Sequence, residues 1–177
     1  MAPRAALISI SSSRSAGSAP DHSREPLERL AGGLGLEVHA FELVPDDREL
    51  IERLLRRYSD EEACELILTS GGTGVAPSDV TPEATLGVID RNVPGIPEAM
   101  REASRPHTPN WMLSRAQAGI RGGTLIVNFP GSPASIEQTG EAIAAALEHA
   151  LALIAGRPSG HRPDPVSQPA RRRRGRA

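Results

Sequence analysis

The chain has 177 residues, a length that suits one domain with a substantial core. Only two Phe, one Tyr and one Trp are present, so the core must consist mainly of Leu, Ile, Val and Ala, as in proteins that pack helices on a sheet. No lysine occurs, which excludes a Schiff-base lysine and the phosphate-binding lysine of a Gly-x-x-x-x-Gly-Lys loop.

The single cysteine, Cys64, excludes an intrachain disulfide and a thiol-rich metal site. We expect a small buried apolar residue there rather than a catalytic thiol. The five histidines show no metal-ligand spacing. No run approaches the roughly 18 apolar residues of a membrane helix, and the N-terminus lacks a signal-peptide pattern. We therefore expect a soluble, unexported protein of the reducing cytoplasm, with no membrane partner.

The net charge of −2 is unevenly distributed. Residues 157–177 contain seven arginines and one aspartate, a net of +6, so the remainder carries −8. This tail is rich in Pro, Ser and Arg without periodicity, and we predict a domain at residues 1–156 followed by a disordered tail. The arginines could contact nucleic acid or an acidic partner. Because no aromatic residue accompanies them, a solvated terminus is favoured over nucleic-acid binding.

The first part of the chain alternates between apolar runs and helical patterns. We expect strands at residues 5–10 and 36–44, and helices at residues 27–34 and 50–55. The pair Asp46-Asp47 precedes the second of these helices, where both aspartates are plausible N-caps.

Residues 66–84 combine an apolar run, a glycine-rich turn and a helix start. The run Leu-Ile-Leu at 66–68 is typical of a buried parallel strand. The glycines that follow allow positive φ and close approach of a ligand to the backbone. Thr81 is a suitable N-cap, with Pro82 at the first helical position. Such turns hold phosphate groups through backbone N–H donors, although a tight structural turn is the alternative interpretation.

The rest of the chain predicts more alternation. We expect helices at residues 81–90, 98–103 and 111–118, a strand at 124–129 and a compact loop at 130–133. Ser135 and Gln138 form a capping-box pattern for a long helix that continues to Ile154.

This alternation predicts an α/β fold: a three-layer α/β/α sandwich around a mostly parallel sheet. Ligands of such sheets bind at the carboxyl ends of the strands. We expect three polar loops to share that edge, at residues 11–21, 70–79 and 130–133.

Five short motifs, in order, resemble the MogA/MoaB family of molybdenum-cofactor biosynthesis proteins, over roughly residues 5–155. They are Thr-Ser-Gly-Gly-Thr-Gly at 69–74, Ser-Asp-Val-Thr-Pro-Glu-Ala at 78–84, Pro94-Gly95 with Glu98 and Arg101, Leu-Ser-Arg at 113–115, and Phe-Pro-Gly-Ser-Pro at 129–133. The resemblance implies a MogA-like fold, a trimer, and a molybdopterin adenylyltransferase that uses Mg-ATP and releases pyrophosphate. Hand-over of the product to a molybdenum-insertion protein is also implied.

The resemblance also implies roles for particular residues. Asp79 and Asp46 match positions associated with catalysis, and Asp79 is the expected Mg²⁺ ligand. Without the resemblance, Asp79 is equally well explained as a turn or cap residue, and Arg115 as a surface or trimer-interface arginine. The implied nucleotide- and pterin-binding residues are Ser70, Gly71, Gly72, Thr73, Gly74, Glu98, Ser114, Arg115, Pro130, Gly131 and Ser132.

Three positions depart from the family pattern. Ser78 stands where relatives usually carry Arg, Ser12 where they carry Asp, and Arg24 where they carry Gly. The first change removes a cation beside the glycine-rich turn and the second removes a carboxylate. A non-catalytic molybdopterin-binding or scaffold member of the same family is therefore the alternative function.

Overall fold

The computed structural model describes residues 2–156. The expected disorder of residues 157–177 lies outside this range, as does the domain boundary placed there.

A six-stranded sheet forms the centre of the described part of the chain, in the order β2-β1-β3-β6-β5-β4. The first four strands in this order are parallel, while β5 is antiparallel to both β6 and β4. The strands are β1 (Arg4–Ile10), β2 (Glu37–Val44), β3 (Leu66–Ser70), β4 (Arg91–Asn92), β5 (Ala118–Arg121) and β6 (Thr124–Phe129). Every residue of β3 and of β6 is buried, as expected for central strands covered on both faces.

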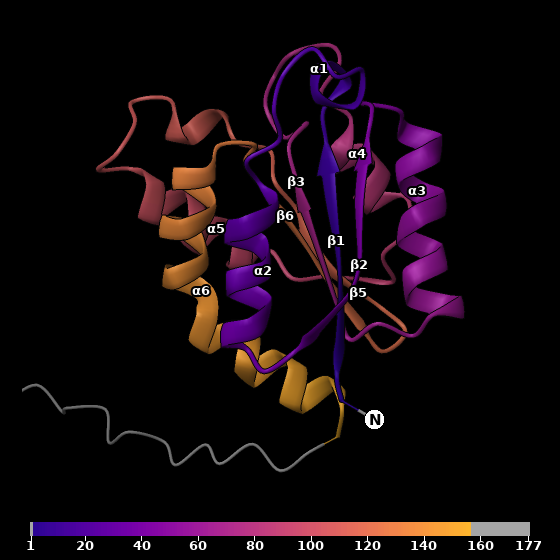
Figure 1. Cartoon of the computed structure of the whole chain (residues 1–177). Coiled ribbons are helices and arrows are strands. Elements are labelled where there is room, and N and C mark those ends of the chain that lie inside the picture. The colour runs from indigo at the N-terminus through magenta and orange to yellow at the C-terminus, as the bar shows by residue number, and fades with distance from the viewer. Residues whose placement is uncertain (1, 157–177) are drawn as a thin grey trace, which may run out of the picture.

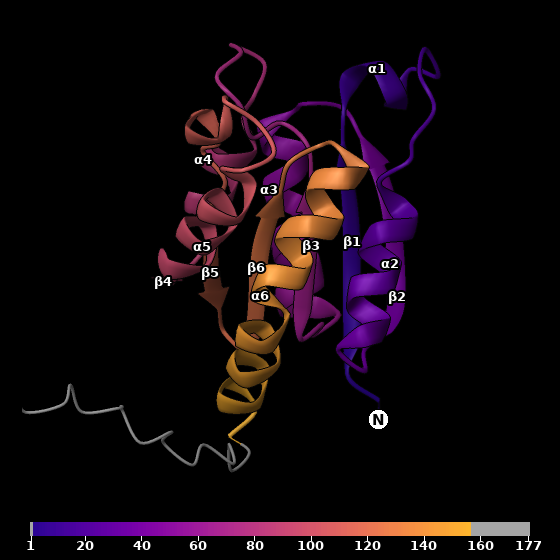
Figure 2. The same ribbon diagram turned by 90° about the vertical axis from the view of Figure 1, so that its left-hand side faces the viewer.

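Helices cover both faces of this sheet. Helices α2, α5 and α6 lie on one face, and α3 and α4 lie on the other (Figures 1 and 2). Their bounds are α1 (Ser12–Ser15), α2 (Arg24–Gly33), α3 (Arg48–Arg56), α4 (Thr81–Leu86), α5 (Gly95–Ser104) and α6 (Pro133–Ile154), with a π turn at Arg57–Glu61 and a 3-10 turn at Trp111–Leu113.

Alternating strand side chains produce two separate cores. Leu7 and Leu68 face the first core, which contains Leu27 of α2 and Ile143 of α6. Ile8 and Ile67 face the second core, which α3 and α4 complete. The predicted α/β/α sandwich with a mostly parallel sheet is confirmed, because this period-two alternation requires apolar helices on both sides.

The carboxyl ends of β1, β3 and β6 lie at the same edge of the sheet, beneath the short helix α1 (Figure 1). The amide of Gly71 donates to the carbonyl of Phe129 at 3.0 Å, and the Ser70 hydroxyl donates to the carbonyl of Pro130 at 3.2 Å. These bonds join the second and third predicted loops at the end of the sheet.

The predicted helix at residues 111–118 is wrong. After the 3-10 turn the chain becomes extended and enters β5. The amide of Arg115 donates to the carbonyl of Thr73 at 2.8 Å, and the amide of Asn128 donates to the carbonyl of Gln117 at 2.9 Å. Bonds to distant segments thus replace the helical bonds that the local pattern indicated.

Two predicted helix starts are also wrong in detail. Thr81 lies inside α4, and its hydroxyl donates to the carbonyl of Gly71 at 2.9 Å instead of capping the helix. Helix α6 begins at Pro133 with Ser132 as N-cap, so Ser135 lies within the helix and the Ser135/Gln138 capping box does not form. No helix among residues 2–156 is long and apolar enough to cross a membrane.

Candidate functional site

A polar cavity of about 280 Å³ lies at the carboxyl edge of the sheet. All three predicted loops and the segment after β2 contribute to it, which confirms that these loops share one edge. The lining residues are Ile10, Ser11, Arg14, Asp46, Gly71, Gly72, Thr73, Gly74, Ser78, Asp79 and Gly131.

The glycine-rich turn presents its backbone to this cavity. Gly71 and Gly72 have φ of +104° and +61°, a region that favours glycine. A Cβ at Gly71 would lie 2.1 Å from the carbonyl oxygen of Ile10. The amides of Gly72, Thr73 and Gly74 have no hydrogen-bond partner within residues 2–156. Because an unpaired amide is a strong donor, three in succession favour an anionic ligand.

Asp46 lines the same cavity and is held through one carboxylate oxygen. Its Oδ2 accepts hydrogen bonds from the amide and the hydroxyl of Ser12, both at 2.8 Å. The Ser12 hydroxyl also accepts a bond from the amide of Asp46 at 3.1 Å. Asp46 Oδ1 has no hydrogen-bond partner among the described residues. Ser12 therefore orients the carboxylate of Asp46.

Asp79 is held in a similar way. Its Oδ2 accepts a hydrogen bond from the amide of Ala76 at 2.8 Å, whereas Oδ1 has no partner within the described range. A Cβ at Gly74 would lie 2.9 Å from Asp79 Oδ2, so Gly74 allows this carboxylate to approach the turn. The free oxygens of Asp46 and Asp79 are hard ligands suited to Mg²⁺.

No cluster of three or more His, Cys, Asp or Glu side chains that could hold a metal ion occurs within residues 2–156. A Mg²⁺ ion at this cavity would accordingly take one or two carboxylates from the protein and its other ligands from water and phosphate oxygens. Mg²⁺ sites in nucleotide-dependent enzymes usually have this composition. The donor set of the cavity therefore fits a magnesium ion that arrives with a phosphate ligand.

Arg14 is the one basic side chain among the residues that line the cavity, and it belongs to none of the sequence motifs described above. Its Nη1 donates to Asp21 Oδ1 at 3.0 Å and to the Ser9 hydroxyl at 3.3 Å, and its Nη2 donates to the carbonyl of Gly131 at 3.2 Å. The only sequence signal was its position within a polar loop expected at the ligand edge.

Asp21 holds this arginine in place. Burial would raise the pKa of Asp21, but hydrogen bonds from the backbone and hydroxyl of Ser23 and from Arg14 outweigh burial and lower that pKa. The side chains of Arg14 and Asp21 are 17% and 11% exposed, so this ion pair is largely protected from solvent.

Arg115 does not line the cavity but braces the turn from outside. Its Nε donates to the carbonyl of Gly74 at 2.6 Å, and its Nη2 donates to the carbonyl of Asp79 at 2.7 Å. Its Nη1 forms an ion pair with Glu83 of α4. The guanidinium thus connects both ends of the segment between Gly74 and Asp79 to the following helix.

The other residues expected in the site lie around it. Ser70 is buried beneath the turn, and Pro130 and Ser132 flank the lining residue Gly131. Ser114 accepts a bond from Arg101 through its carbonyl at 3.4 Å. Glu98 is exposed in the first turn of α5. These residues are near the loops of the site, but none of them lines the cavity.

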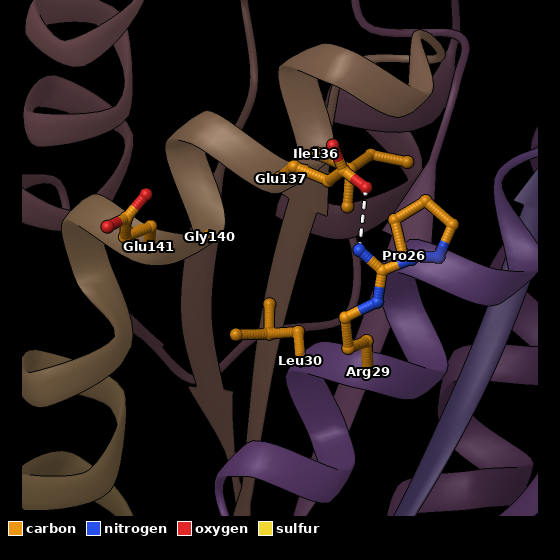
Figure 3. Close-up of a pocket in the computed structure, with 7 residues that line it drawn as sticks. All are labelled: Pro26, Arg29, Leu30, Ile136, Glu137, Gly140 and Glu141. Atoms are coloured by element: carbon orange, nitrogen blue, oxygen red, sulfur yellow. Dashed lines mark hydrogen bonds and ion pairs between the residues drawn. The ribbon is translucent and has the colours of Figure 1, made fainter.

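A second hollow, of about 310 Å³, lies between α2 and α6 (Figure 3). Arg29 and Glu137 form an ion pair across it at 2.8 Å, and Leu30 and Ile136 supply apolar surface. It shares no lining residue with the polar cavity. Its one basic side chain, Arg29, is ion-paired with two carboxylates, Glu25 and Glu137, so its charge is already neutralised.

Comparison with known proteins gives a consistent result. The family model described as "Probable molybdopterin binding domain" matches residues 6–149. A molybdopterin adenylyltransferase of Helicobacter pylori strain J99 is 46% identical over 121 residues, which is 68% of each chain. A protein of the same name from Escherichia coli K12 is 43% identical over 145 residues, covering 79% of this chain and 73% of its own.

Solved structures share the fold. The molybdopterin biosynthesis enzyme MoaB from Thermus thermophilus superposes with a TM-score of 0.82 at 44% identity, covering 89% of this chain and 99% of its own. The molybdopterin biosynthesis Mog protein from Mycobacterium ulcerans superposes with a TM-score of 0.81 at 34% identity, covering 86% and 99%.

Proposed function

This chain belongs to the family of molybdopterin-binding domains, and we propose that it is a molybdopterin adenylyltransferase, an enzyme of molybdenum-cofactor biosynthesis. In the proposed reaction, an oxygen of the terminal phosphate of molybdopterin attacks the α-phosphorus of ATP. The bond from that phosphorus to the β-phosphate oxygen breaks, and pyrophosphate leaves. The products are adenylylated molybdopterin and pyrophosphate.

The observation that best supports this reaction is the row of unpaired amides at Gly72, Thr73 and Gly74, beside the free oxygens of Asp46 and Asp79 in the described part of the chain. Nucleotidyl transfer needs positioned phosphates and neutralised charge more than it needs a covalent nucleophile. The amides would hold phosphate oxygens in fixed positions. The two carboxylates would hold the metal that accompanies a nucleotide.

We assign Asp79 and Asp46 as the residues that hold Mg²⁺, with Asp79 as the principal ligand. A bound Mg²⁺ would supply positive charge to the phosphates and orient them. The hydrogen bonds from Ala76 and Ser12 fix each carboxylate through Oδ2, which leaves Oδ1 available. Replacement of the family carboxylate by Ser12 is consistent with this role, because Ser12 orients Asp46.

Ligand-contacting roles for the remaining residues stay part of the proposal. Ser70, Gly71, Pro130, Gly131 and Ser132 lie on the joined loops and would shape the phosphate site. Glu98, Ser114 and Arg115 belong to the neighbouring segments and would contact the pterin. In this structure Arg115 holds the turn, so its contribution to pterin binding would require it to exchange at least one of these bonds.

The experiment that tests the proposal is incubation of the purified protein with molybdopterin, ATP and Mg²⁺, followed by chromatographic and mass analysis of the pterin. We expect adenylylated molybdopterin and one pyrophosphate per product. Omission of ATP should abolish the product, and chelation of Mg²⁺ should abolish it until Mg²⁺ is restored.

The alternative is a non-catalytic molybdopterin-binding or scaffold protein of the same family. It is favoured by Ser78, which lines the cavity at a position where the family resemblance implies an arginine. Under this alternative the protein binds molybdopterin but forms no product with Mg-ATP.

We also propose a trimer in the cytoplasm that delivers its product to a molybdenum-insertion protein. Val75, Met112 and Leu113 support an oligomer, because they are 63%, 62% and 47% exposed and lie on segments joined by the bond between Arg115 and Thr73.

A further inference from the structure

We propose that Arg14 is a phosphate-binding residue, whose guanidinium donates to a phosphate oxygen of a ligand in the polar cavity. This inference rests on the proposed function for the identity of the ligands, ATP and molybdopterin. Both carry phosphate groups, and the experiment below distinguishes which of them Arg14 contacts.

The first observation is the charge balance of the cavity. Two carboxylates, Asp46 and Asp79, line it, and Arg14 is the one basic residue among its lining residues. A triphosphate or a phosphomonoester brings further negative charge. Magnesium offsets part of this charge, and an arginine at the cavity wall would offset more.

The second observation is the donor count of Arg14. A guanidinium has five N–H donors, and three of them are used, toward Ser9, Asp21 and Gly131. The Nε–H and one N–H of Nη2 have no partner within residues 2–156. These two N–H groups are therefore available to a ligand, and a guanidinium can bind phosphate oxygens through two such donors.

The third observation is that Arg14 is positioned in advance. Its side chain is 17% exposed and is fixed at three points, so ordering it costs little entropy when a ligand binds. A Cβ at Gly131 would lie 3.1 Å from Nη2, so the glycine leaves room for the guanidinium beside the third loop. Asp21 is the positioning residue, because its carboxylate accepts a hydrogen bond from Nη1 and so fixes the orientation of the Arg14 guanidinium.

Ser78 also lines the cavity, but its side chain carries no charge. The positive charge among the lining residues therefore comes from Arg14, in the loop after β1.

The test measures binding of two probes by calorimetry: Mg²⁺ with an ATP analogue that has a methylene bridge between the α- and β-phosphorus, and molybdopterin alone. The variants are Arg14→Gln, Arg14→Lys and, as a matched control, Arg29→Gln. Arg29 is an exposed arginine that forms ion pairs with Glu25 and Glu137 outside the cavity. Thermal unfolding of each variant checks the fold.

We expect Arg14→Gln to weaken binding of at least one probe by about tenfold or more, the usual effect of losing a charge-assisted hydrogen bond. The probe that loses affinity identifies the phosphate that Arg14 contacts. Arg14→Lys should restore part of this affinity, because it keeps the charge but not the fork. Arg29→Gln should bind both probes within about twofold of the wild type.

Asp21→Asn separates positioning from a purely structural role. It should reduce affinity for the same probe as Arg14→Gln, and in the Arg14→Gln background it should cause little further loss. Independent, additive losses would contradict the assignment of Asp21 as the residue that positions Arg14.

The inference is overturned if Arg14→Gln is folded and binds both probes as the wild type does, or if the wild type binds neither. Failure of the proposed function looks different. In that case the wild type binds the probes, Arg14→Gln weakens binding, and no adenylylated molybdopterin forms.

Discussion

At Gly71 the backbone combines a φ of +104° with a packed neighbour, since a Cβ there would lie 2.1 Å from the carbonyl oxygen of Ile10. We predict that Gly71→Ala lowers the free energy of unfolding by at least about 1 kcal/mol, because an alanine is strained at this φ and displaces the first strand. Denaturant unfolding measures the change. Gly32→Ala is the matched control, because nothing lies within 4 Å of a Cβ there, in an exposed helical position. Equal stability of the two variants would show that the positive φ and the close contact at Gly71 do not require a glycine.

Cys64 was expected to be a buried apolar residue, and it is 1% exposed. Burial raises the pKa of its thiol to about 11, so the thiolate that reacts with alkylating reagents is scarce at neutral pH. We predict that iodoacetamide at a mildly alkaline pH leaves the folded protein unlabelled and labels one site after denaturation, as measured by intact mass. Rapid labelling of the folded protein would contradict this prediction.

The site residues of the glycine-rich turn were easier to predict from the sequence than the residues around the turn. Gly71, Gly72, Thr73, Gly74 and Asp79 could be placed at the ligand edge because they follow an apolar strand directly. Arg14 could not be identified, because its direction depends on contacts with Ser9, Asp21 and Gly131, which are set by tertiary packing. The hydrogen bonds from Arg115 to the turn could not be predicted either, because its partners are about 40 residues earlier in the chain.

At the scale of elements, Arg115 and Glu83 connect the glycine-rich turn to α4. A hydrogen bond from Arg115 lowers the pKa of Glu83 below its ordinary value of 4.5. A carboxylate with a lowered folded-state pKa stabilises the protein above its unfolded pKa, and that contribution is lost as the pH falls through the folded pKa.

We therefore predict that Glu83→Gln destabilises the protein at neutral pH and that its difference from the wild type shrinks as the pH falls below 4.5. The side chains of Glu83 and Arg115 are 41% and 37% exposed. Solvent screening therefore limits the loss of unfolding free energy at neutral pH to about 1 kcal/mol or less. Denaturant unfolding at several pH values measures it. A difference that grows at acid pH would show that the pair does not act in this way.

The elements with the clearest local signals were the ones that could be predicted. Strands β1, β3 and β6 are continuous apolar runs, and their parallel arrangement followed from the helices between them. Strands β4 and β5 were missed because they are two and four residues long and carry no alternating pattern. The segment around Trp111 has helical spacing, yet the amide of Arg115 donates to Thr73 and the carbonyl of Gln117 accepts from Asn128 of β6. Those long-range partners are not visible in the local sequence.

At the scale of the whole molecule, the exposed apolar side chains near the glycine-rich turn are candidates for a contact between subunits. If Val75, Met112 and Leu113 form the trimer contact, sedimentation velocity should give a mass three times the 18.7 kDa of one chain. Met112→Glu should shift the protein toward monomer, because it places a charge in the contact.

Leu153→Glu serves as the control, since Leu153 is 56% exposed at the far end of α6. It should leave the mass unchanged. A wild-type protein that stays monomeric at all concentrations, or equal effects of the two variants, would contradict the proposed contact.

The central claim is that adenylyl transfer occurs at the cavity where Asp79 meets the glycine-rich turn. The most direct test is the rate of adenylylated molybdopterin formation by the wild type, Asp79→Asn and Asp47→Asn. Asp47 caps α3 by accepting from the amide of Leu50 at 3.0 Å, does not line the cavity, and can be replaced by Asn with the cap retained. We predict full activity in Asp47→Asn and a loss of at least about 100-fold in a folded Asp79→Asn. Wild-type turnover in Asp79→Asn would contradict the claim.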